Sequence, residues 1–359
     1  MQDVKKAVWL TNVDSEVMNS RQQLAIGLQR LADLGFKTIY PVVWQRGYTL
    51  YPSKVAQQLT GASLLPNSPF IGRDLLAEII ELAAPLNIRT IPWFEYGLMV
   101  PPKSAIALNN PDLLTLDRQG NPQRTQNTNG KLDPNAWLNP CHDRVRKFMV
   151  DLITEVAQTY PVAGIQLDDH FCFPAEMGYD RYTQQLFQQY NCHKFDLGRK
   201  RWHQWGTEQL TALLQQIVNS VKSIRPDCIV SISPNPLAFS RNHYLVDWQR
   251  WQELGLIDEL VLQVYRDRSD AFKLELDKPE VRAIQTKIPT SIGILTGLRT
   301  RSISSEIIKT QVATIRDRQF NGVACFFYET LFHERLAPHR ISRTRSQLLD
   351  IFNIDRSST

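Results

Sequence analysis

Two adjacent carboxylates, Asp168 and Asp169, end the apolar segment "VAGIQLDD" and are followed directly by His170. In a β-strand alternate side chains face the same way, so Asp168 shares a face with Gln166, and the apolar residues between them face the other way. A buried carboxylate without a partner is energetically costly. A single acid in this place usually pairs with an arginine or caps the next helix. Two acids in a row, with further acids at other strand ends, favour a catalytic role.

Acids also end two other apolar segments. Glu95 ends "IPWFE", and Glu329 follows "CFFY". Burial disfavours the charged form of a carboxyl group, which raises its pKa and suits it to act as a general acid. The alternative for each residue is a structural ion pair with Arg46 or Arg266. Paired carboxyl groups, one protonating the leaving oxygen and one attacking or activating water, are the machinery of glycoside hydrolysis.

Aromatic rings and side-chain amides follow the same predicted strand ends. Rings with a polar edge suit ligands that have apolar faces and hydroxyl rims, and sugars have that character. The residues that we expect to bind such a substrate are Trp44, Tyr48, Trp93, His170, Asn235, Gln263, Tyr265 and Tyr328. For any single ring a place in the core is the more common outcome, so the prediction depends on their clustering at one face.

Eight strand-like segments alternate with amphipathic helical patterns. The predicted strands are Ala7–Asn12, Thr38–Trp44, Arg89–Tyr96, Gly164–Asp169, Cys228–Ser233, Glu259–Tyr265, Thr290–Leu295 and Gly322–Tyr328. Strands separated by helices pair in parallel, and eight such units predict an α/β protein closed into a (β/α)8 TIM barrel. An open doubly wound sheet is the alternative, but the turn after the first strand lacks the glycines that it would need.

No linker rich in glycine or serine and no internal repeat divides the chain. We therefore predict one barrel domain over residues 1–350 and a C-terminal tail over residues 351–359. Two connections that leave strands are long, Gln45–Ile71 after the second strand and Gly97–Cys141 after the third. Long loops in a compact domain are usually functional, and the loops that leave barrel strands carry the active site.

Composition and motifs argue against several other classes of protein. The net charge of +5 is modest for 359 residues, and no aromatic residues interleave with the C-terminal arginines, so we expect no nucleic-acid partner. We see no membrane span and no signal peptide in the chain. There is no GxSxG, no P-loop and no HxH after the first strand, so we expect no metal and no cofactor. The five cysteines form no CxxC motif, and a bridge between Cys172 and Cys192 stays open.

A phosphorylated sugar is a third possible ligand. Its anion site would need donors after the seventh and eighth strands, where "LTGLRTRS" offers Gly297, Arg299 and Arg301. The same pattern is also that of an ordinary helix start, which is its commoner meaning.

Six segments carry a further signal: "AVWLTNVDSEV", "IYPVVWQRGYTLYPS", "IPWFEYG", "WLNPCHDRVRKFMVDLITEVAQTYPVAGIQLDDHF", "VSISPNP" and "LVLQVYRD". In this order they resemble the glycosyl-hydrolase-10-like family of bacteria, especially its cyanobacterial members, from about Ala7 to Leu331. The resemblance implies a (β/α)8 barrel that acts on or binds a cell-envelope polysaccharide such as peptidoglycan glycan. The resemblance also suggests the periplasm or cell envelope, where a leader could have been trimmed from the chain, but the sequence itself leaves the location open.

The fourth predicted strand is also similar to short motifs of other glycosidases. "GIQLDDH" resembles the D-G-I-D-I-D-W-E motif of family 18 chitinases, with Asp168 at its second inner acid. Gln166 replaces another acid of that motif, and His170 stands where its catalytic Glu would be, so chemistry that uses this Glu is not implied. The fourth strand of the alpha-amylases is an equally good match for Gln166 and Asp168.

We therefore predict a metal-independent glycoside hydrolase that cleaves an oligo- or polysaccharide. Asp168 is the predicted nucleophile or base, with Asp169 orienting it or sharing its proton. Glu329, or failing that Glu95, is the predicted acid. The alternative is a barrel that binds sugar but has lost catalysis, which the missing chitinase-type Glu keeps open.

Overall fold

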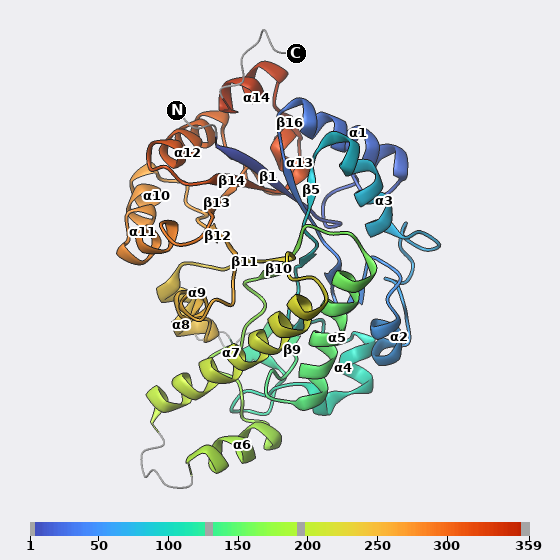
Figure 1. Cartoon of the computed structure of the whole chain (residues 1–359), viewed down its shortest axis with the longest axis vertical. Helices are drawn as coiled ribbons and strands as arrows, with labels where there is room; N and C mark the ends of the chain where they lie inside the picture. Colours follow the sequence, from blue (N-terminus) through green and yellow to red (C-terminus); the bar gives the residue numbers. More distant parts are fainter. Residues whose placement is uncertain (1–3, 126–131, 192–197, 353–359) are drawn as a thin grey trace.

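The computed structural model describes residues 4–125, 132–191 and 198–352 of the chain. A ring of parallel strands lies at its centre, and helices surround the ring (Figure 1). In spatial order the strands are β5 (Arg89–Thr90), β2 (Thr38–Pro41), β1 (Lys5–Leu10), β14 (Gly322–Phe326), β13 (Thr290–Leu295), β12 (Glu259–Gln263), β11 (Ile229–Ser233), β10 (Gly164–Asp168) and β6 (Trp93–Phe94).

The ring is closed because its third strand takes part in both ends of the sheet. β5 and β6 are two parts of that strand, separated by Ile91 and Pro92. β5 pairs in parallel with β2, and β6 pairs in parallel with β10. Across the break the Ile91 N–H donates to the Ile39 carbonyl at 3.0 Å, and the Gln166 N–H donates to the Pro92 carbonyl at 2.8 Å. The predicted (β/α)8 barrel is confirmed.

The eight strands predicted from the sequence are all present, and most of them end earlier than predicted. The second strand stops at Pro41, so Trp44 does not belong to it. Trp44 instead begins a hairpin of β3 (Trp44–Gln45) and β4 (Tyr48–Thr49). Arg46 and Gly47 form its two-residue turn with φ values of +53° and +81°, as such tight turns require.

Helices follow the strands and cover the outside of the ring. They are α1 (Arg21–Asp33), α2 (Lys54–Thr60), α3 (Leu75–Ala83), α4 (Ala105–Asn109), α5 (Asp143–Thr159), α6 (Arg181–Asn191), α7 (Arg199–Ile224), α8 (Leu237–Tyr244), α9 (Trp248–Glu253), α10 (Ser269–Leu276), α11 (Pro279–Gln285), α12 (Ser305–Asp317), α13 (Tyr328–Phe332) and α14 (Arg345–Phe352).

The helix α5 shows how the amphipathic pattern produces this layer. The His142 ring caps its first turn by accepting from the Arg144 N–H. Apolar residues three or four apart lie on one side of a helix, and that side is buried here. The buried residues are Val145, Phe148, Met149, Leu152, Ile153, Val156 and Ala157. The amphipathic helical pattern predicted before the fourth strand is therefore confirmed.

Polar side chains occupy part of the barrel interior. The Trp9 indole N–H donates to Gln166 Oε1 at 2.8 Å, and the Gln166 amide donates to Ser231 Oγ at 3.0 Å. The Ser231 hydroxyl then donates to Glu259 at 2.8 Å, and Tyr40 donates to the same carboxylate at 3.0 Å. These five side chains are buried. Gln166 therefore faces the interior, and the two-residue period of β10 directs Asp168 the same way.

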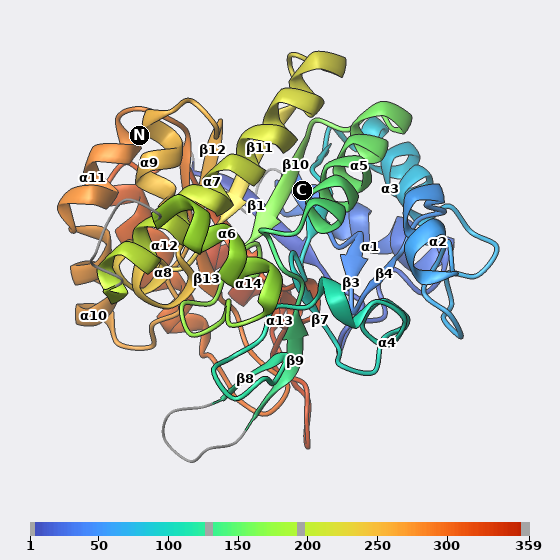
Figure 2. The same cartoon turned by 90° about the horizontal axis from the view of Figure 1, so that it is seen from below.

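Both long connections predicted after the second and third strands carry ordered structure. Gly97–Cys141 contains a three-stranded antiparallel sheet of β7 (Met99–Val100), β9 (Leu132–Trp137) and β8 (Gln123–Thr125), which the sequence analysis did not predict. Figure 2 shows these strands at the same end of the molecule as α13. A further hairpin, β15 (His333–Arg335) and β16 (Ile341–Ser342), follows α13.

The C-terminal residues of the described chain pack onto the barrel. Ile351 and Phe352 of the predicted tail belong to α14 and are buried, and the Phe352 ring lies 5.3 Å from that of Phe36. The rest of the predicted tail, residues 353–359, lies outside the described residues. Cys172 is buried with a free thiol, and its possible partner Cys192 also lies outside them.

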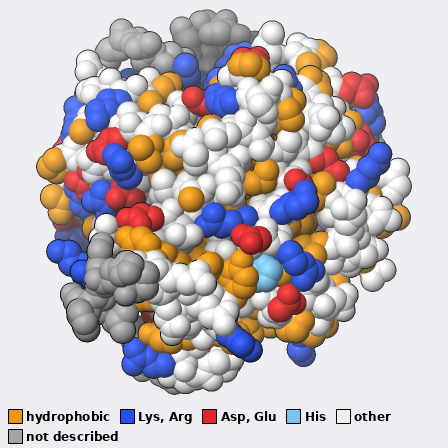
Figure 3. All heavy atoms as spheres, turned by 60° about the horizontal axis from the view of Figure 1, so that its bottom comes forward, with side chains coloured by type: hydrophobic (Ala, Val, Ile, Leu, Met, Phe, Trp, Pro, Cys, Tyr) orange, Lys and Arg blue, Asp and Glu red, His pale blue; other side chains and the backbone are white. Residues whose placement is uncertain are grey.

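Two surface properties bear on possible partners. On the face shown in Figure 3, lysine and arginine side chains intermingle with aspartate and glutamate. None of the helices within the described ranges combines the length and the apolar character that crossing a lipid bilayer requires.

Gly97 generates a prediction, because it lies where the third-strand loop touches the end of β10. Its φ is +46°, and a Cβ atom there would lie 2.5 Å from the His170 carbonyl carbon and from the Phe171 nitrogen. Left-handed strain alone costs ~1–2 kcal/mol. We expect Gly97→Ala to lower the free energy of unfolding by more than this, because backbone atoms cannot move aside. Urea denaturation measures the effect.

The matched control is Gly72→Ala. Gly72 has a φ of +75°, and a Cβ atom there would meet nothing within 4 Å. It carries the conformational strain without the clash. Equal losses of stability in the two variants would contradict a close approach at Gly97.

Candidate active site

Three acids and a histidine meet at the end of the fourth barrel strand. Asp168 ends β10, and Asp169 and His170 follow it, while Glu95 comes directly after the neighbouring strand β6. His170 Nδ1 lies 3.0 Å from the Glu95 carbonyl oxygen. The same nitrogen lies 3.7 Å from Asp168 Oδ2 and 3.7 Å from Asp169 Oδ1. The imidazole therefore joins all three acidic residues.

The two amides predicted to bind sugar hold the acids. Gln263 Nε2 donates to Asp168 Oδ1 at 2.8 Å, and the backbone N–H of Asp169 donates to the same oxygen at 2.8 Å. Asn235 Nδ2 donates to Asp169 Oδ2 at 2.7 Å. Asp168 is almost fully buried, with 4% of its side chain exposed, against 18% for Asp169. The hydrogen bonds fix both carboxylates in place at the mouth of the barrel.

Burial and mutual charge shift the proton affinities of this cluster. Burial, and then the charge of Asp169, raise the pKa of Asp168 well above its usual range. Burial alone would lower the pKa of His170, but the neighbouring Asp169 and Asp168 outweigh it and raise that pKa to about 10. His170 is thus an imidazolium at neutral pH, and its charge compensates that of the aspartate pair.

Glu95 has the properties of a general acid. It is half-buried, and its Oε2 accepts a hydrogen bond from Gln45 Nε2 at 3.1 Å. Burial raises its pKa to about 7, although the charge of His170 and the hydrogen bond from Gln45 act in the opposite direction. A carboxyl group with this pKa carries a proton part of the time at neutral pH, which acid catalysis requires.

Glu329, the acid that the sequence analysis preferred, lies elsewhere on the rim. It belongs to α13, and its Oε1 accepts from the Ser15 hydroxyl at 3.3 Å and from the Glu16 N–H at 3.1 Å. Within the described ranges, no hydrogen bond or ion pair joins it to Asp168 or Asp169. Glu95 is the acid that the structure brings beside the aspartate pair.

The structural alternatives considered for the acids are not what the structure shows. Among the described residues no ion pair joins an arginine to Asp168 or Glu95, and Arg266 pairs with Glu275 at 3.5 Å. The arginines of the possible anion site are also engaged. Arg299 pairs with Asp14 at 2.8 Å, and Arg301 pairs with Asp267.

The aromatic residues predicted to bind sugar lie in different places. The Tyr265 ring lies 5.7 Å from Phe326, and burial together with the charges of Asp168 and Asp169 raises the pKa of Tyr265 well above its usual range. Trp93 is buried inside the ring of strands, 6.3 Å from Trp9. Tyr265 is therefore near the cluster, whereas Trp93 packs in the barrel interior.

The other three predicted aromatic residues are farther from the chemistry. Trp44 is fully buried, and its indole donates to the Gly97 carbonyl at 3.0 Å. Tyr328 is buried between the barrel and α1, where its hydroxyl lies 3.1 Å from the position of a Cβ at Gly27. Tyr48 is half-buried in the β3–β4 hairpin. Trp44 and Tyr328 therefore pack the core.

Sequence reasoning missed three residues that contact the cluster. Gln45 holds Glu95, while the rings of Tyr96 and Trp137 each lie 6.2 Å from the His170 ring. Gln45 begins, and Trp137 lies within, the two connections predicted to be functional because of their length. The length of the two connections could have pointed to Gln45 and Trp137. Spacing along the chain, however, does not show which residue of a long loop returns to the site.

Asp168, Asp169 and His170 could offer three ligand atoms within 4.8 Å of one another. The chemistry of the donor set fits a metal poorly. His170 Nδ1 already faces the Glu95 carbonyl oxygen at 3.0 Å, so this nitrogen would have to give up that contact to bind a cation. The cluster has the character of an ion-paired acid–base group.

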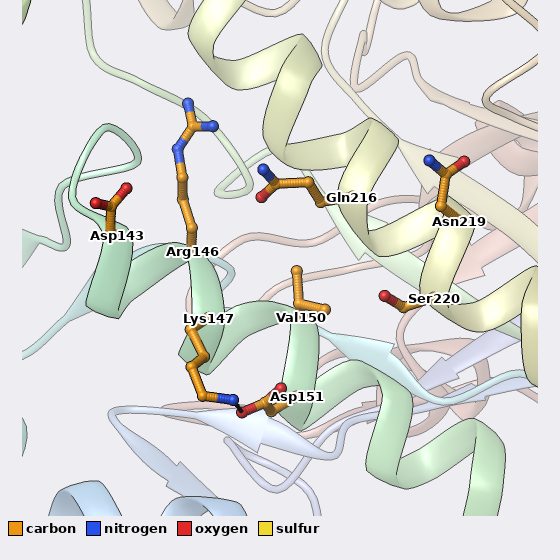
Figure 4. Close-up of a pocket in the computed structure, with 8 residues that line it drawn as sticks. All are labelled: Asp143, Arg146, Lys147, Val150, Asp151, Gln216, Asn219 and Ser220. Carbon is orange, nitrogen blue, oxygen red and sulfur yellow. Dashed lines mark hydrogen bonds and ion pairs between the residues drawn. The ribbon is translucent and has the colours of Figure 1, made fainter.

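Two cavities of the structure lie away from this cluster. A groove of about 450 Å³ runs between α5 and α7 (Figure 4), but its charged residues already have partners: Arg146 donates to the Pro140 carbonyl, and Lys147 pairs with Asp151. A second cavity of about 180 Å³ lies at the N-terminal ends of the strands, beside Glu259. We therefore locate the candidate site by its chemistry and not by cavity volume.

Fold and site together define a class. A closed (β/α)8 barrel with carboxyl groups gathered at the C-terminal end of its fourth strand has the architecture of barrel glycoside hydrolases. The sequence profile of one family, described as "Glycosyl hydrolase-like 10", matches residues 5–314, and the chain belongs to that family.

Curated relatives agree with this membership. The proteins called "Glycosyl hydrolase DigH" in Escherichia coli and Shigella flexneri are 25% identical over 291 residues, which is 72% of this chain and 61% of theirs. The chain thus spans about three fifths of the length of the curated relatives that it matches.

Solved structures share the fold. The PgaB (BpsB) glycoside hydrolase domain from Bordetella bronchiseptica superposes with a TM-score of 0.65 at 13% identity, covering 90% of this chain and 94% of that one. The catalytic domain of beta-amylase from Paenibacillus polymyxa gives 0.64 at 10% identity, covering 98% and 97%. These neighbours show that the chain shares the barrel fold of glycoside hydrolase domains.

The raised pKa of Glu95 predicts a pH-dependent stability. The folded protein holds the Glu95 proton up to pH about 7, whereas the unfolded chain releases it near pH 4.5. The free energy of unfolding therefore falls as the pH rises through this window, and Glu95→Gln removes that loss. We expect Glu95→Gln to stabilise the protein by up to ~3 kcal/mol more at about pH 8 than at about pH 4.

Urea denaturation of both proteins at the two pH values gives this difference. The comparison at about pH 4, where the carboxyl group is protonated in both states, measures the effect of the amide itself. A stabilisation that does not change with pH would show that Glu95 has an ordinary pKa.

Proposed function

We propose that this protein is a metal-independent glycoside hydrolase whose catalytic carboxyl groups are Glu95 and the Asp168–Asp169 pair. The observation that carries the proposal is the position of Glu95. Glu95 directly follows the strand next to β10, and its carboxyl group has a pKa of about 7. Its backbone carbonyl contacts His170 Nδ1, the same nitrogen that faces the aspartate pair. Glycoside hydrolysis needs one carboxyl group that gives a proton and a second group that attacks or activates water.

In this mechanism Glu95 protonates the glycosidic oxygen as the bond to the leaving sugar breaks. Asp168 attacks the anomeric carbon or removes a proton from the attacking water. Asp169 orients the Asp168 carboxylate. The positive charge of His170 and the amide of Gln263 hold Asp168 where the substrate meets it. Of the aromatic residues predicted from the sequence, Tyr265 is the one that would contact the sugar, because its hydroxyl is close enough to Asp168 and Asp169 to be affected by their charges.

The proposed substrate is a cell-envelope polysaccharide such as the glycan of peptidoglycan. The resemblance of the sequence to the glycosyl-hydrolase-10-like family supports this class of substrate. Incubation of the purified protein with glycan strands, with and without their peptides, tests it. Release of new reducing ends from either form supports the proposal, and intact strands in both cases contradict it.

Three single variants test the assignment of the carboxyl groups. We expect Asp168→Asn to lower kcat at least ~10³-fold and Glu95→Gln to lower it ~10²–10⁴-fold. Glu329→Gln is the matched control, because its carboxylate is bound to the loop after β1, and its kcat should stay within a few-fold of the wild type. Substantial loss only in Glu329→Gln would move the acid to the position that the sequence first suggested.

The pH dependence of the reaction tests the role of Glu95 independently. Because the protonated form is the catalyst, we expect kcat/KM to decline as the pH rises above about 7. In Glu95→Gln this decline should disappear from the small activity that remains. A substrate with a leaving group that needs no proton, such as an aryl glycoside, should recover much of the loss. An unchanged alkaline limb in the variant would exclude Glu95 as the acid.

A further inference from the structure

A cavity lies inside the barrel at the N-terminal ends of its strands, at the opposite end from the aspartate cluster. We call it the basal cavity. It has a volume of about 180 Å³, whereas a single water molecule needs only ~10–15 Å³. Bulky branched side chains fill the interior of most barrels of this kind. Two strands that line the basal cavity contribute small side chains instead, Ala7 of β1 and Ser291 of β13, so space is left where a packed layer is expected.

A buried carboxylate lines the inner part of the basal cavity. Only 7% of Glu259 is exposed, and its Oε1 accepts hydrogen bonds from Tyr40 at 3.0 Å and from Ser231 at 2.8 Å. Its second oxygen, Oε2, accepts no hydrogen bond from the described residues, yet it keeps accessible surface. None of the lysines, arginines and histidines that the structure describes forms an ion pair with it. Buried carboxylates are usually paired with a positive charge, so this oxygen suits a cationic donor.

Two positively charged side chains lie at the mouth of the basal cavity. Lys5 and Arg89 line it and are exposed, and Arg89 Nη2 donates to the Thr38 hydroxyl at 3.0 Å. Burial, and then the charge of Glu259, raise the pKa of Tyr40 well above its usual range, while the charge of Arg89 acts in the opposite direction. The guanidinium is therefore close enough to act on the groups inside the cavity.

The other acid that lines the cavity already has partners. Asp258 Oδ2 pairs with Lys222 Nζ at 2.7 Å and accepts from the Val230 N–H at 2.8 Å. Over residues 4–125, 132–191 and 198–352, neither Lys5 nor Arg89 forms an ion pair. The basal cavity thus presents a negative group inside and two unpaired positive groups at its mouth.

We propose that the basal cavity binds a small zwitterionic α-amino acid, with its ammonium group on Glu259 and its carboxylate on Arg89 and Lys5. The ammonium group would donate to Glu259 Oε2 inside the cavity. The carboxylate would accept from the guanidinium and the lysine ammonium at the mouth, and such charge-assisted hydrogen bonds are the strong ones. The inference goes beyond the proposed glycoside hydrolase function and does not depend on it.

The distribution of charge favours a zwitterion over ligands that carry a single charge. A simple amine would satisfy Glu259 but would be repelled by the positive side chains at the mouth. An anion would bind to Arg89 and Lys5 but would be repelled by the carboxylate of Glu259. An α-amino acid carries both charges close together, and a small one matches a cavity of about 180 Å³.

The test compares probes of nearly equal size: L-alanine, D-alanine, isopropylamine and isobutyrate. Isopropylamine has a methyl group in place of the carboxylate of alanine, and isobutyrate has one in place of the ammonium group. We expect at least one enantiomer of alanine to bind ~10-fold or more tightly than either analogue, because each analogue leaves one set of charged groups unsatisfied. Titration calorimetry measures the affinities. A rise of the melting temperature on addition of alanine verifies that the folded protein is the form that binds.

Variants of the lining residues test the assignment of each charge. Glu259→Gln and Arg89→Met should each weaken the binding of alanine ~10-fold or more. Lys37→Met is the matched control, since Lys37 is an exposed lysine directly before β2 that does not line the cavity, and it should keep the wild-type affinity. Ala7→Val keeps every polar group and narrows the cavity, so it should also weaken binding, and it tests the site even where Glu259→Gln prevents folding. Urea denaturation verifies that each variant is folded.

Several outcomes would overturn the proposal. Binding of isopropylamine or isobutyrate as tight as that of alanine would show that only one charge is recognised. Alanine binding that Glu259→Gln, Arg89→Met and Ala7→Val all leave unchanged would place the ligand elsewhere, and no measurable binding of either enantiomer would leave the cavity without this ligand. None of these measurements uses a glycan, so their failure does not touch the proposed hydrolase, and a protein that cleaves no glycan can still bind alanine.

Discussion

The hydrogen bonds of Gln166 inside the barrel determine where the cluster of Asp168, Asp169 and His170 lies. A fully buried amide must satisfy both its donor and its acceptor, and Trp9 and Ser231 do so from β1 and β11. These contacts fix the rotation of β10 about its own axis. A shift by one residue would turn Gln166 toward the helices without partners and take Asp168 out of the mouth. The position of the site is thus a consequence of how the barrel satisfies its interior.

Electrostatic interactions both stabilise and destabilise the site that results. Asp168, Asp169 and Glu95 share a small volume, and their mutual repulsion and burial oppose folding. The protonated ring of His170 and the amides of Gln263 and Asn235 reduce that repulsion. Burial, more than this repulsion, raises the pKa of Glu95 to about 7 and keeps a proton on it near neutral pH. The raised pKa of Glu95 therefore lowers the stability of the fold and is also the property that acid catalysis would use.

The insertion after the third strand adds what a plain barrel lacks. Its first residue, Gly97, touches the backbone after Asp168, and its last strand brings Trp137 to His170. The insertion is thus bound to the catalytic cluster at two points. Barrels with unrelated activities share the ring of strands, so such loops are where differences in substrate arise.

The sequence by itself determined the barrel and the inward direction of Asp168, because alternation of side chains along a strand and the 3.6-residue helical period are local properties. It placed Glu329 ahead of Glu95 as the acid, although both end apolar strands with similar composition. Only the closed ring shows which of the two lies beside Asp168, because β6 is the neighbour of β10, whereas β14 lies between β1 and β13. The roles of Gln263 and Asn235, and the burial of Trp44 and Tyr328, were decided in the same way. Which side chains meet across strands depends on long-range packing, and spacing along the chain does not encode it.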